Sequence, residues 1–168
     1  MTLAGSLQGL DDSSRQYLLC FRVGNQWYAI DVQYVFEVAQ MVTISGVPDM
    51  PEAIRGVVNV RGSIVPVLDL RIRFNMPTRN LDLTTPIIFI QHDDNAFGLI
   101  ADDIDDVFQV HEGMIRPTEL RKRADHIVGL IEHRSRLTTI IDPLVLLATS
   151  LQGQNFDELT AKIPDSLD

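Results

Sequence analysis

The side chains of this chain that could do chemistry are few and scattered. Cys20 is the only cysteine, which excludes an internal disulfide and any metal site built from several cysteines. Since only Arg22 on the same strand face could stabilise a thiolate, we expect Cys20 to be a buried structural residue. The four histidines show no metal-ligand spacing, and we expect each of them on the surface or in a turn: His92, His111, His126 and His133.

One acidic cluster stands out, and its members are Asp102, Asp103, Asp105 and Asp106. Its spacing lacks the glycine and the final glutamate of a calcium-binding loop, so we interpret it as a solvated turn. Motifs of serine hydrolases, dinucleotide-binding folds, phosphate-binding loops and zinc proteases are absent from the sequence. We therefore expect no catalytic site, no metal and no cofactor, and we favour a binding module. Carboxylates that are distant in the sequence could still meet in the fold.

Composition excludes two classes of partner. The net charge of −9 and the pI near 4.7 disfavour binding to nucleic acid or to anionic lipid, both of which need a basic surface. The longest basic run, at 121–123, is expected in a solvated loop. No stretch approaches the roughly 20 apolar residues that span a bilayer, and no cationic start precedes an apolar run. We expect a cytoplasmic protein without membrane insertion.

The chain must position its candidate residues mainly on strands. Valine and isoleucine recur in short runs separated by turn residues, which predicts four hairpins at 17–30, 57–68, 86–101 and 127–141 and a further strand at 107–110. A short helix is expected at 32–39, where apolar residues have helical spacing, with Glu37 outside the apolar stripe. From this segment alone, Glu37 is most simply a solvated glutamate. Asp69 and Asp142 are expected to cap helical turns at 70–74 and 143–147.

The hairpin at 57–68 is the most legible segment. Arg61 and Gly62 lie at its tip, where glycine accommodates a positive φ and holds Arg61 exposed. By the two-residue period of a strand, Asn59 and Arg61 share a face that is free to meet solvent or a partner. Pro66 cannot donate a ladder hydrogen bond, which predicts a sheet edge or a bulge there.

An internal repeat predicts the architecture. A shift of 73 residues lays Gly56 on Gly129, Arg61 on Arg134 and Asp69 on Asp142, whereas Gly62 meets Ser135. A shift of 72 residues aligns 35–38 with 107–110. We therefore expect a mainly β fold of two copies of about seventy residues, each a small closed barrel, with a groove for a partner between them. The glycine turn belongs to the first copy only.

These residues also carry a family resemblance. The run VFEV, a proline-containing loop, the run IRGVVNVRGSIVPVLDLR and the helix start IIDPL together resemble the CheW family of chemotaxis coupling proteins, over residues 16–148. The resemblance implies two side-by-side five-stranded β-barrels with short helices and no enzymatic activity. It implies an adaptor that joins the cytoplasmic tips of chemoreceptors to a CheA-type histidine kinase at membrane-associated arrays.

The resemblance also implies a site. Val35 and Glu37 are expected in the receptor-contact segment, and the hairpin beside it carries the remaining candidates: Gly56, Asn59, Arg61 and Gly62. The guanidinium of Arg61 could hold a carboxylate or carbonyl of the partner, or brace Glu37. The kinase-facing surface is expected around residues 19–30. Outside the family span, we expect a flexible leader at 1–15 and an acidic tail at 149–168 that is disordered or lightly docked.

Two alternatives remain open. One is a CheW-like adaptor of a nonflagellar pathway such as surface motility. The other is a small enzyme or ligand-binding β-barrel. A metal, cofactor or substrate between the barrels would support the second, whereas an open groove lined by valine, isoleucine and Arg61 would support an adaptor.

Overall fold

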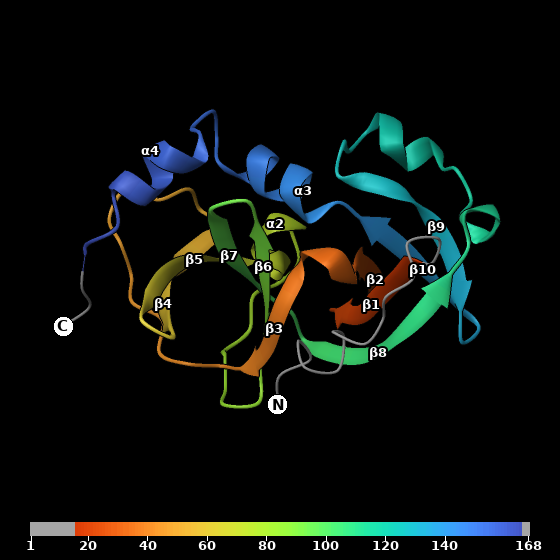
Figure 1. The fold of residues 1–168 in the computed structure, drawn as a ribbon, viewed down its shortest axis with the longest axis horizontal. Helices are drawn as coiled ribbons and strands as arrows, with labels where there is room; N and C mark the ends of the chain where they lie inside the picture. The colour runs from red at the N-terminus through yellow and green to blue at the C-terminus, as the bar shows by residue number, and fades with distance from the viewer. Residues whose placement is uncertain (1–15, 166–168) are drawn as a thin grey trace.

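The structure is a computed structural model that describes residues 16–165, so the expected leader at 1–15 lies outside the described residues. Its ten described strands form two five-stranded sheets, which lie side by side in Figure 1. Sheet I has the order β3-β6-β7-β5-β4 and contains β3 Val35–Gln40, β4 Ile54–Val60, β5 Ser63–Asp69, β6 Pro86–His92 and β7 Asn95–Ile100. Sheet II has the order β8-β1-β2-β10-β9 and contains β1 Gln16–Val23, β2 Gln26–Asp31, β8 Asp103–Val110, β9 Ile127–His133 and β10 Arg136–Ile141. The expected mainly β fold of two five-stranded units is confirmed.

The internal repeat is present in the structure, but its two copies are interleaved. Strands β3, β6, β7, β5 and β4 of sheet I correspond in order to β8, β1, β2, β10 and β9 of sheet II. Sheet I thus contains β3, β4 and β5 of the first copy and the hairpin β6–β7 of the second copy. Sheet II contains the hairpin β1–β2 of the first copy and β8, β9 and β10 of the second copy. The joins are parallel pairings, of β5 with β7 and of β10 with β2. The expectation that each copy builds its own barrel is therefore wrong.

Neither sheet closes into a barrel through a continuous ladder of hydrogen bonds, so the expectation of closed barrels is also wrong. The ends of each sheet are joined only by single bridges from the segment that follows one end strand: Ser45, after β3, pairs with Val57 of β4, and Arg116, after β8, pairs with Leu130 of β9. Gly56 and Gly129 make these bridges sterically feasible. A Cβ on Gly56 would lie 2.3 Å from the carbonyl oxygen of Ser45, and one on Gly129 would lie 2.9 Å from that of Arg116.

The segment expected to be a helix at 32–39 is instead a 3₁₀ turn, η1 Val32–Tyr34, followed by strand β3. Asp31 does cap the turn, because its carboxylate accepts from the backbone N–H of Gln33. Strand β3 pairs antiparallel with β6 and has a bulge between Val35 and Glu37. A valine-rich segment fits a pleated ladder, and the neighbouring strand overrides the helical spacing.

Pro66 does not lie on an edge strand, since β5 lies between β4 and β7. Its partner in β4 is Val57, which exchanges both of its backbone hydrogen bonds with Ser45 on the other side. The pair of Pro66 and Val57 is thus a non-hydrogen-bonded one, and the ladder with β7 begins only at Val67. The missing N–H therefore costs no ladder bond.

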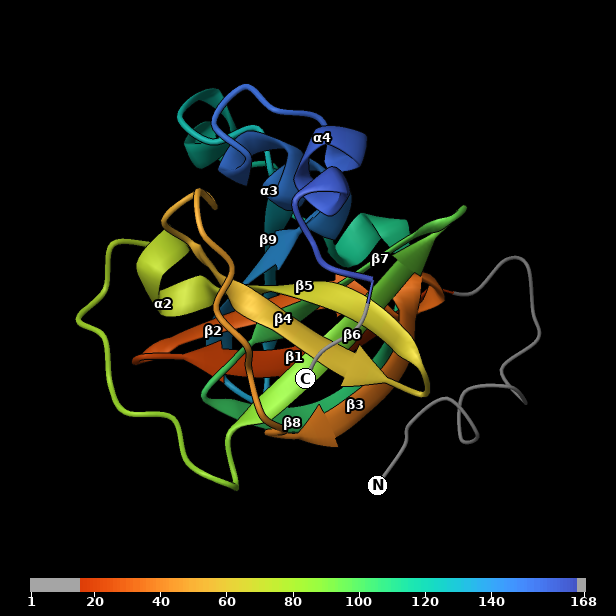
Figure 2. The ribbon, with the colours of Figure 1, turned by 90° about the vertical axis from the view of Figure 1, so that its left-hand side faces the viewer.

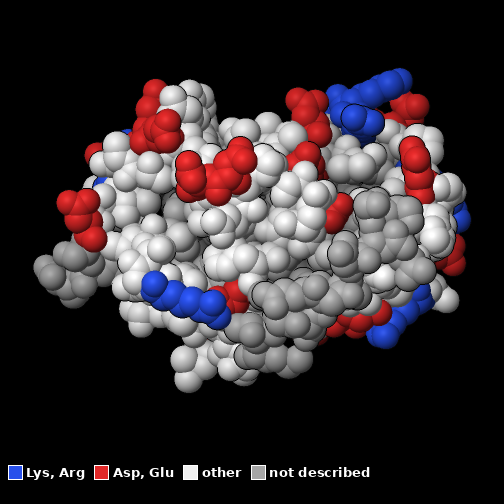
Figure 3. Space-filling model, viewed as in Figure 1, with Lys and Arg blue, Asp and Glu red and all other residues white. Residues whose placement is uncertain are grey.

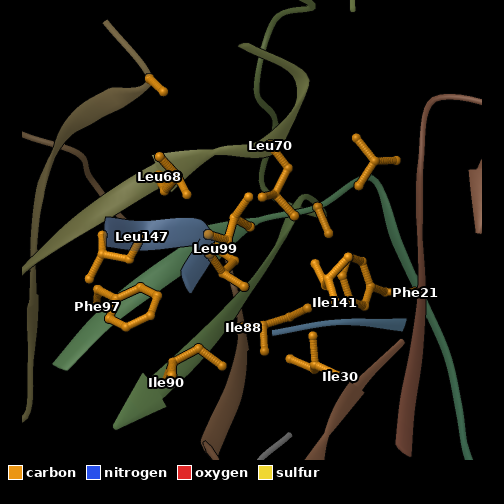
Figure 4. Close-up of a cluster of buried hydrophobic side chains, with 14 of the residues drawn as sticks. Phe21, Ile30, Leu68, Leu70, Ile88, Ile90, Phe97, Leu99, Ile141 and Leu147 are labelled. Carbon is orange, nitrogen blue, oxygen red and sulfur yellow. The ribbon is translucent and has the colours of Figure 1, made fainter. Parts of the chain in front are cut away.

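The largest hydrophobic cluster lies between the two sheets. Figure 4 shows Phe21 and Ile30 of sheet II near Ile88 of sheet I, and Leu147 of α3 beside Phe97 of sheet I. Two smaller clusters fill the concave interiors of the individual sheets. The buried members of these clusters are Val58, Val65, Val67, Ile87, Phe89 and Ile100 in sheet I, and Leu18, Ala29, Val110, Ile131 and Ile140 in sheet II. Side chains therefore occupy the barrel-like interiors where a ligand would otherwise sit.

Short helices cover the junction of the sheets. Asp69 caps α2 Leu70–Arg73 and Asp142 caps α3 Pro143–Ser150, both as predicted. The remaining helices are η2 Glu112–Met114, η3 Glu119–Lys122 and α4 Phe156–Ala161. Helix α4 lies in the expected tail and is docked, because Leu159 is fully buried. No helix of the described residues has the length and apolar character needed to span a membrane.

Candidate functional site

The tip of the β4–β5 hairpin is built to hold one arginine outward. Arg61 and Gly62 have φ values of 51° and 86°, the signature of a two-residue turn with both central residues left-handed. The side chain of Asn59 stabilises the turn, since its Oδ1 accepts from the backbone N–H of Gly62 at 2.9 Å. The side chain of Arg61 is consequently 72% exposed.

Arg61 lies beside the second predicted charge. Its Nη2 is 3.5 Å from Oε2 of Glu37 on β3, at the opposite end of the sheet order. The two charges lie within ion-pair distance, as the bracing hypothesis requires. Glu37 is not the solvated glutamate of the simplest interpretation, because its side chain is only 12% exposed and its Oε2 accepts no hydrogen bond from the described residues. This carboxylate thus retains unused capacity to accept.

The other two candidate residues have structural roles. Val35 is buried in the cluster between the sheets, so it cannot present its side chain to a partner. Gly56 has a φ of 154° and no room for a Cβ beside Ser45. The structure therefore brings Glu37, Asn59, Arg61 and Gly62 together at the hairpin tip and leaves Val35 and Gly56 in supporting positions.

The equivalent tip in sheet II is closed by more charges. Arg134 contacts Asp105 and Asp106 of β8, with both closest N–O distances at 3.3 Å. Arg136 also pairs with Asp105, and His133 Nε2 lies 3.0 Å from Asp106. The carboxylates of sheet II are thus occupied internally, whereas Glu37 meets a single exposed arginine. The expectation that Asp105 and Asp106 form a solvated turn is wrong.

A groove lies between the two sheets on the β3 side, as the repeat predicted. It has a volume of about 300 Å³ and is lined by Val38, Ala39, Gln40, Thr84 and Pro86 from the side of sheet I and by Asp103 and Ile104 of β8. A second hollow of about 360 Å³ adjoins the hairpin and is lined by Arg61, Phe36 and Ile64 among others. Strand β3 contributes residues to both hollows, and Arg61 itself lines the second.

Sequence reasoning missed a buried carboxylate at the crossing from β7 to β8. The side chain of Asp102 is 4% exposed. Nε of Arg71 donates to both of its carboxylate oxygens at 2.9 and 3.0 Å, Nη2 of Arg71 lies 2.8 Å from Oδ2, and Nε of Arg79 lies 3.2 Å from Oδ1. The backbone N–H of Gly24 also donates to Asp102. Burial raises the pKa of this carboxyl, but the hydrogen bonds and the two guanidinium charges outweigh burial and lower the pKa overall. Asp102 is a structural clamp, not a solvated residue.

Two histidine predictions and one cysteine prediction can be compared with the fold. His126 is buried against Phe74 and has a lowered pKa, chiefly because of burial and then because of Arg73. His133 is half-buried and stacks on Phe108, so neither is the expected surface residue. Cys20 is fully buried as predicted, and burial, reinforced by Asp105, raises the pKa of its thiol to about 11. This thiol is unreactive at neutral pH.

The expected kinase-facing segment at 19–30 is mostly interior. Strands β1 and β2 are central in sheet II, and Leu19, Cys20 and Phe21 are buried. Within this segment only Asn25 and Gln26, at the hairpin turn, are exposed. On the face in Figure 3 the basic side chains lie in separate small groups and acidic side chains are spread over the face, in keeping with the net charge of −9.

Comparisons with known proteins agree with this architecture. The sequence profile of the family described as "CheW-like domain" matches residues 17–150. This chain belongs to the CheW family. The chemotaxis protein CheW of Bacillus subtilis is 35% identical over 133 residues, which cover 77% of this chain and 85% of that protein. The chemotaxis protein CheW of Klebsiella aerogenes is 29% identical over 137 residues, which cover 80% of this chain and 82% of that protein.

A solved structure supports the same assignment. The crystal structure of the scaffolding protein TtCheW from Thermoanaerobacter tengcongensis superposes with a TM-score of 0.69 at 28% sequence identity, over 78% of this chain and 86% of that chain. CheW-family proteins are scaffolds rather than enzymes. This protein is accordingly a non-enzymatic chemotaxis adaptor, of the class that couples chemoreceptors to CheA-type histidine kinases.

Proposed function

We propose that this adaptor contacts the cytoplasmic tip of a chemoreceptor through β3 and the β4–β5 hairpin, with the Glu37–Arg61 pair at the centre of the contact. The observation that carries the proposal is the pairing of a nearly buried carboxylate with one exposed guanidinium at 3.5 Å. The buried Oε2 of Glu37 holds the exposed guanidinium of Arg61 at the surface, where the guanidinium can donate to a carboxylate or carbonyl of a partner. The adaptor acts in the cytoplasm, at receptor arrays.

The groove beside this pair suits a helical partner. Its walls carry the side chains of Val38, Pro86 and Ile104, with Gln40 and Asp103 at the polar positions. An amphipathic helix could lay its apolar face in such a groove while its polar residues reach the rim. The equivalent carboxylates of sheet II are already paired with Arg134 and Arg136, which favours the sheet I tip for partner contact.

The adaptor transmits a signal by binding the active and inactive arrangements of receptor and kinase unequally. A protein that binds both arrangements with equal affinity does not shift the equilibrium between them, however tightly it binds. The kinase surface must lie outside the buried parts of β1 and β2. If receptor binding changes the affinity of the adaptor for the kinase, kinase binding must change its affinity for the receptor by the same factor.

A reconstituted assay tests this function. Purified CheA-type kinase, receptor fragments in membranes and the full chain are combined, and kinase autophosphorylation is followed with and without receptor ligand. The proposal predicts that ligand control of the kinase requires this protein. Ligand control without the protein, or no control in its presence while all components are folded, would exclude the proposed coupling.

A further inference from the structure

Helix α4 lies outside the 17–150 span that matches the CheW-like domain. Figures 1 and 2 show it on the outer side of sheet I, next to α3. A capping box folds its first turn, in which the side chain of Asn155 accepts from the N–H of Glu158 and Glu158 accepts from the N–H of Asn155. The helix has six residues, too short to be stable in isolation, so it is folded only while it is docked.

The docking contact depends on two apolar side chains. Leu159 is fully buried in the cluster between the sheets, and Phe156 packs against the same cluster while only partly buried. Phe156 and Leu159 are three positions apart and therefore share one face of the helix. Beyond its own capping bonds, the described contacts of α4 and its C-cap include one polar link to the rest of the fold, from Nζ of Lys162 to the carbonyl oxygen of Asp49 at 2.8 Å.

The surface under α4 is larger than the helix fills. Two hollows of about 360 Å³ each flank Phe156. The first shares its wall with the Arg61 hairpin and is lined by Phe36, Val60, Arg61, Ile64 and Thr160 among others. The second has mainly apolar walls, from Phe97, Leu144, Leu147, Ala148, Leu151 and Phe156, together with the polar residues His92, Asn95, Gln154 and Asn155. Both hollows border Phe156 of α4, and we name the two hollows with the seat of α4 between them the α4 groove.

The connection to α3 permits α4 to leave the groove. Gln152 and Gly153 follow α3 with φ values of 53° and 86°, and Gln152 holds this conformation without being glycine. The connecting residues 152 and 153 are exposed, so few contacts hold the linker. Elements with few buried contacts open at a lower free energy than the rest of a fold.

We propose that the α4 groove is a docking site for a short amphipathic helix, occupied within the chain by α4 and able to accept a partner's helix that carries an aromatic residue and a leucine three positions apart. Helix α4 itself defines this chemistry, since it is the helix that the groove holds. As a tethered competitor, α4 acts at an effective concentration of about millimolar order, which suppresses weaker partners. A partner that displaces α4 also remodels the hollow beside Arg61.

The test uses the full chain and a labelled peptide of residues 151–165. Leu159→Asp in the chain releases α4, because a charge cannot occupy its buried position. We expect the peptide to bind this variant at least tenfold more tightly than the wild-type chain, measured by fluorescence anisotropy. A peptide that carries the same Leu159→Asp substitution should not bind. Leu137→Asp, at a leucine that is 61% exposed, is the matched control chain and should behave as wild type.

Absence of peptide binding to a folded Leu159→Asp chain would overturn the proposal, and so would equal binding by the substituted peptide. Circular dichroism with a cooperative melt establishes that the variant is folded. If it does not fold, amide hydrogen exchange in the wild-type chain gives the answer. The proposal then requires α4 amides to exchange at least tenfold faster than those of α3, and equal rates would show that α4 does not open independently.

Discussion

Nη2 of Arg61 lies 3.5 Å from Oε2 of Glu37, which ties the tip of the β4–β5 hairpin to the strand at the other end of the same sheet. Arg134 makes the corresponding link in sheet II, to Asp105 and Asp106 of β8. Both sheets are thus drawn toward closure by a single backbone bridge and by an ion pair at a hairpin tip. The two links differ in exposure and in the number of charges, and this difference is the basis for proposing the Arg61 tip as the partner surface.

The paired turns give a direct test of backbone strain. Ser135 occupies with a φ of 61° the position that glycine occupies in the first repeat. A residue with a Cβ pays about 1 kcal/mol in this region, so Ser135→Gly should raise the melting temperature by about 2–4 °C. Gly62→Ser should lower the melting temperature by a similar amount. A Cβ there meets no atom within 4 Å, so only the energy of the left-handed backbone conformation changes. Calorimetry that finds no opposite shifts would contradict this account of the turns.

Gly56→Ala should be far more costly. The added Cβ would lie 2.3 Å from the carbonyl oxygen of Ser45, in a backbone conformation with a φ of 154°. Separation of the bridge between Ser45 and Val57 would follow, and we expect a loss of about 3 kcal/mol or more in the free energy of unfolding, measured with urea. Gly46→Ala, next to Ser45 in the chain, is the matched control, because its Cβ would meet nothing within 4 Å. Equal effects of the two substitutions would refute the steric explanation.

Asp102→Asn tests the clamp between the sheets. The substitution leaves Arg71 without its bidentate carboxylate, and we expect a loss of about 2–4 kcal/mol in the free energy of unfolding near pH 7. Because the pKa of Asp102 is lowered in the fold, its contribution is present above the ordinary aspartate pKa and is lost as the pH falls through the folded value. The difference between wild type and variant should therefore shrink in acid. A difference that stays constant in urea titrations at low pH would exclude this role.

His126 should make the fold sensitive to mild acid. Its pKa is lowered by burial and by Arg73, so below about 6.5 the unfolded chain takes up a proton that the folded chain resists. Stability should consequently fall as the pH drops from about 7.5 to 5.5. His126→Phe keeps a ring next to Phe74, whose centroid lies 5.9 Å from that of the imidazole, and should flatten this part of the profile. An unchanged profile in the variant would assign the dependence to other groups.

Local patterns predicted the hairpins well, because each depends on adjacent residues and a turn. Asp69 and Asp142 were identified as helix caps for the same reason. The interleaving of the two copies was not predictable, since the hairpin that pairs with β5 or β10 is chosen by long-range packing. Helical spacing at 32–39 was misleading because a neighbouring strand, β6, supplies hydrogen bonds that the segment cannot reveal.

The site was predicted in part. The sequence placed Arg61 at an exposed tip and offered Glu37 as a bracing partner, but the distance between them depends on how the ends of sheet I approach. Asp102 looked like one member of an acidic run, because its partners Arg71 and Arg79 are distant in the sequence. In the fold, its buried side chain and its pairs with the two arginines distinguish it from the exposed Asp103.

The most direct test of the adaptor account compares the two arginines at the equivalent tips. Wild type, Arg61→Ala and Arg134→Ala are each titrated against a receptor-tip fragment and against a CheA-type kinase, with the melting temperature of each protein measured in parallel. The exposed pair of Arg61 contributes under about 1 kcal/mol to stability, so the Arg61→Ala protein should remain folded. We expect at least tenfold weaker receptor binding for Arg61→Ala and unchanged receptor binding for Arg134→Ala, with kinase binding retained in both. Unchanged receptor binding by folded Arg61→Ala, or an equal loss in both variants, would contradict the account.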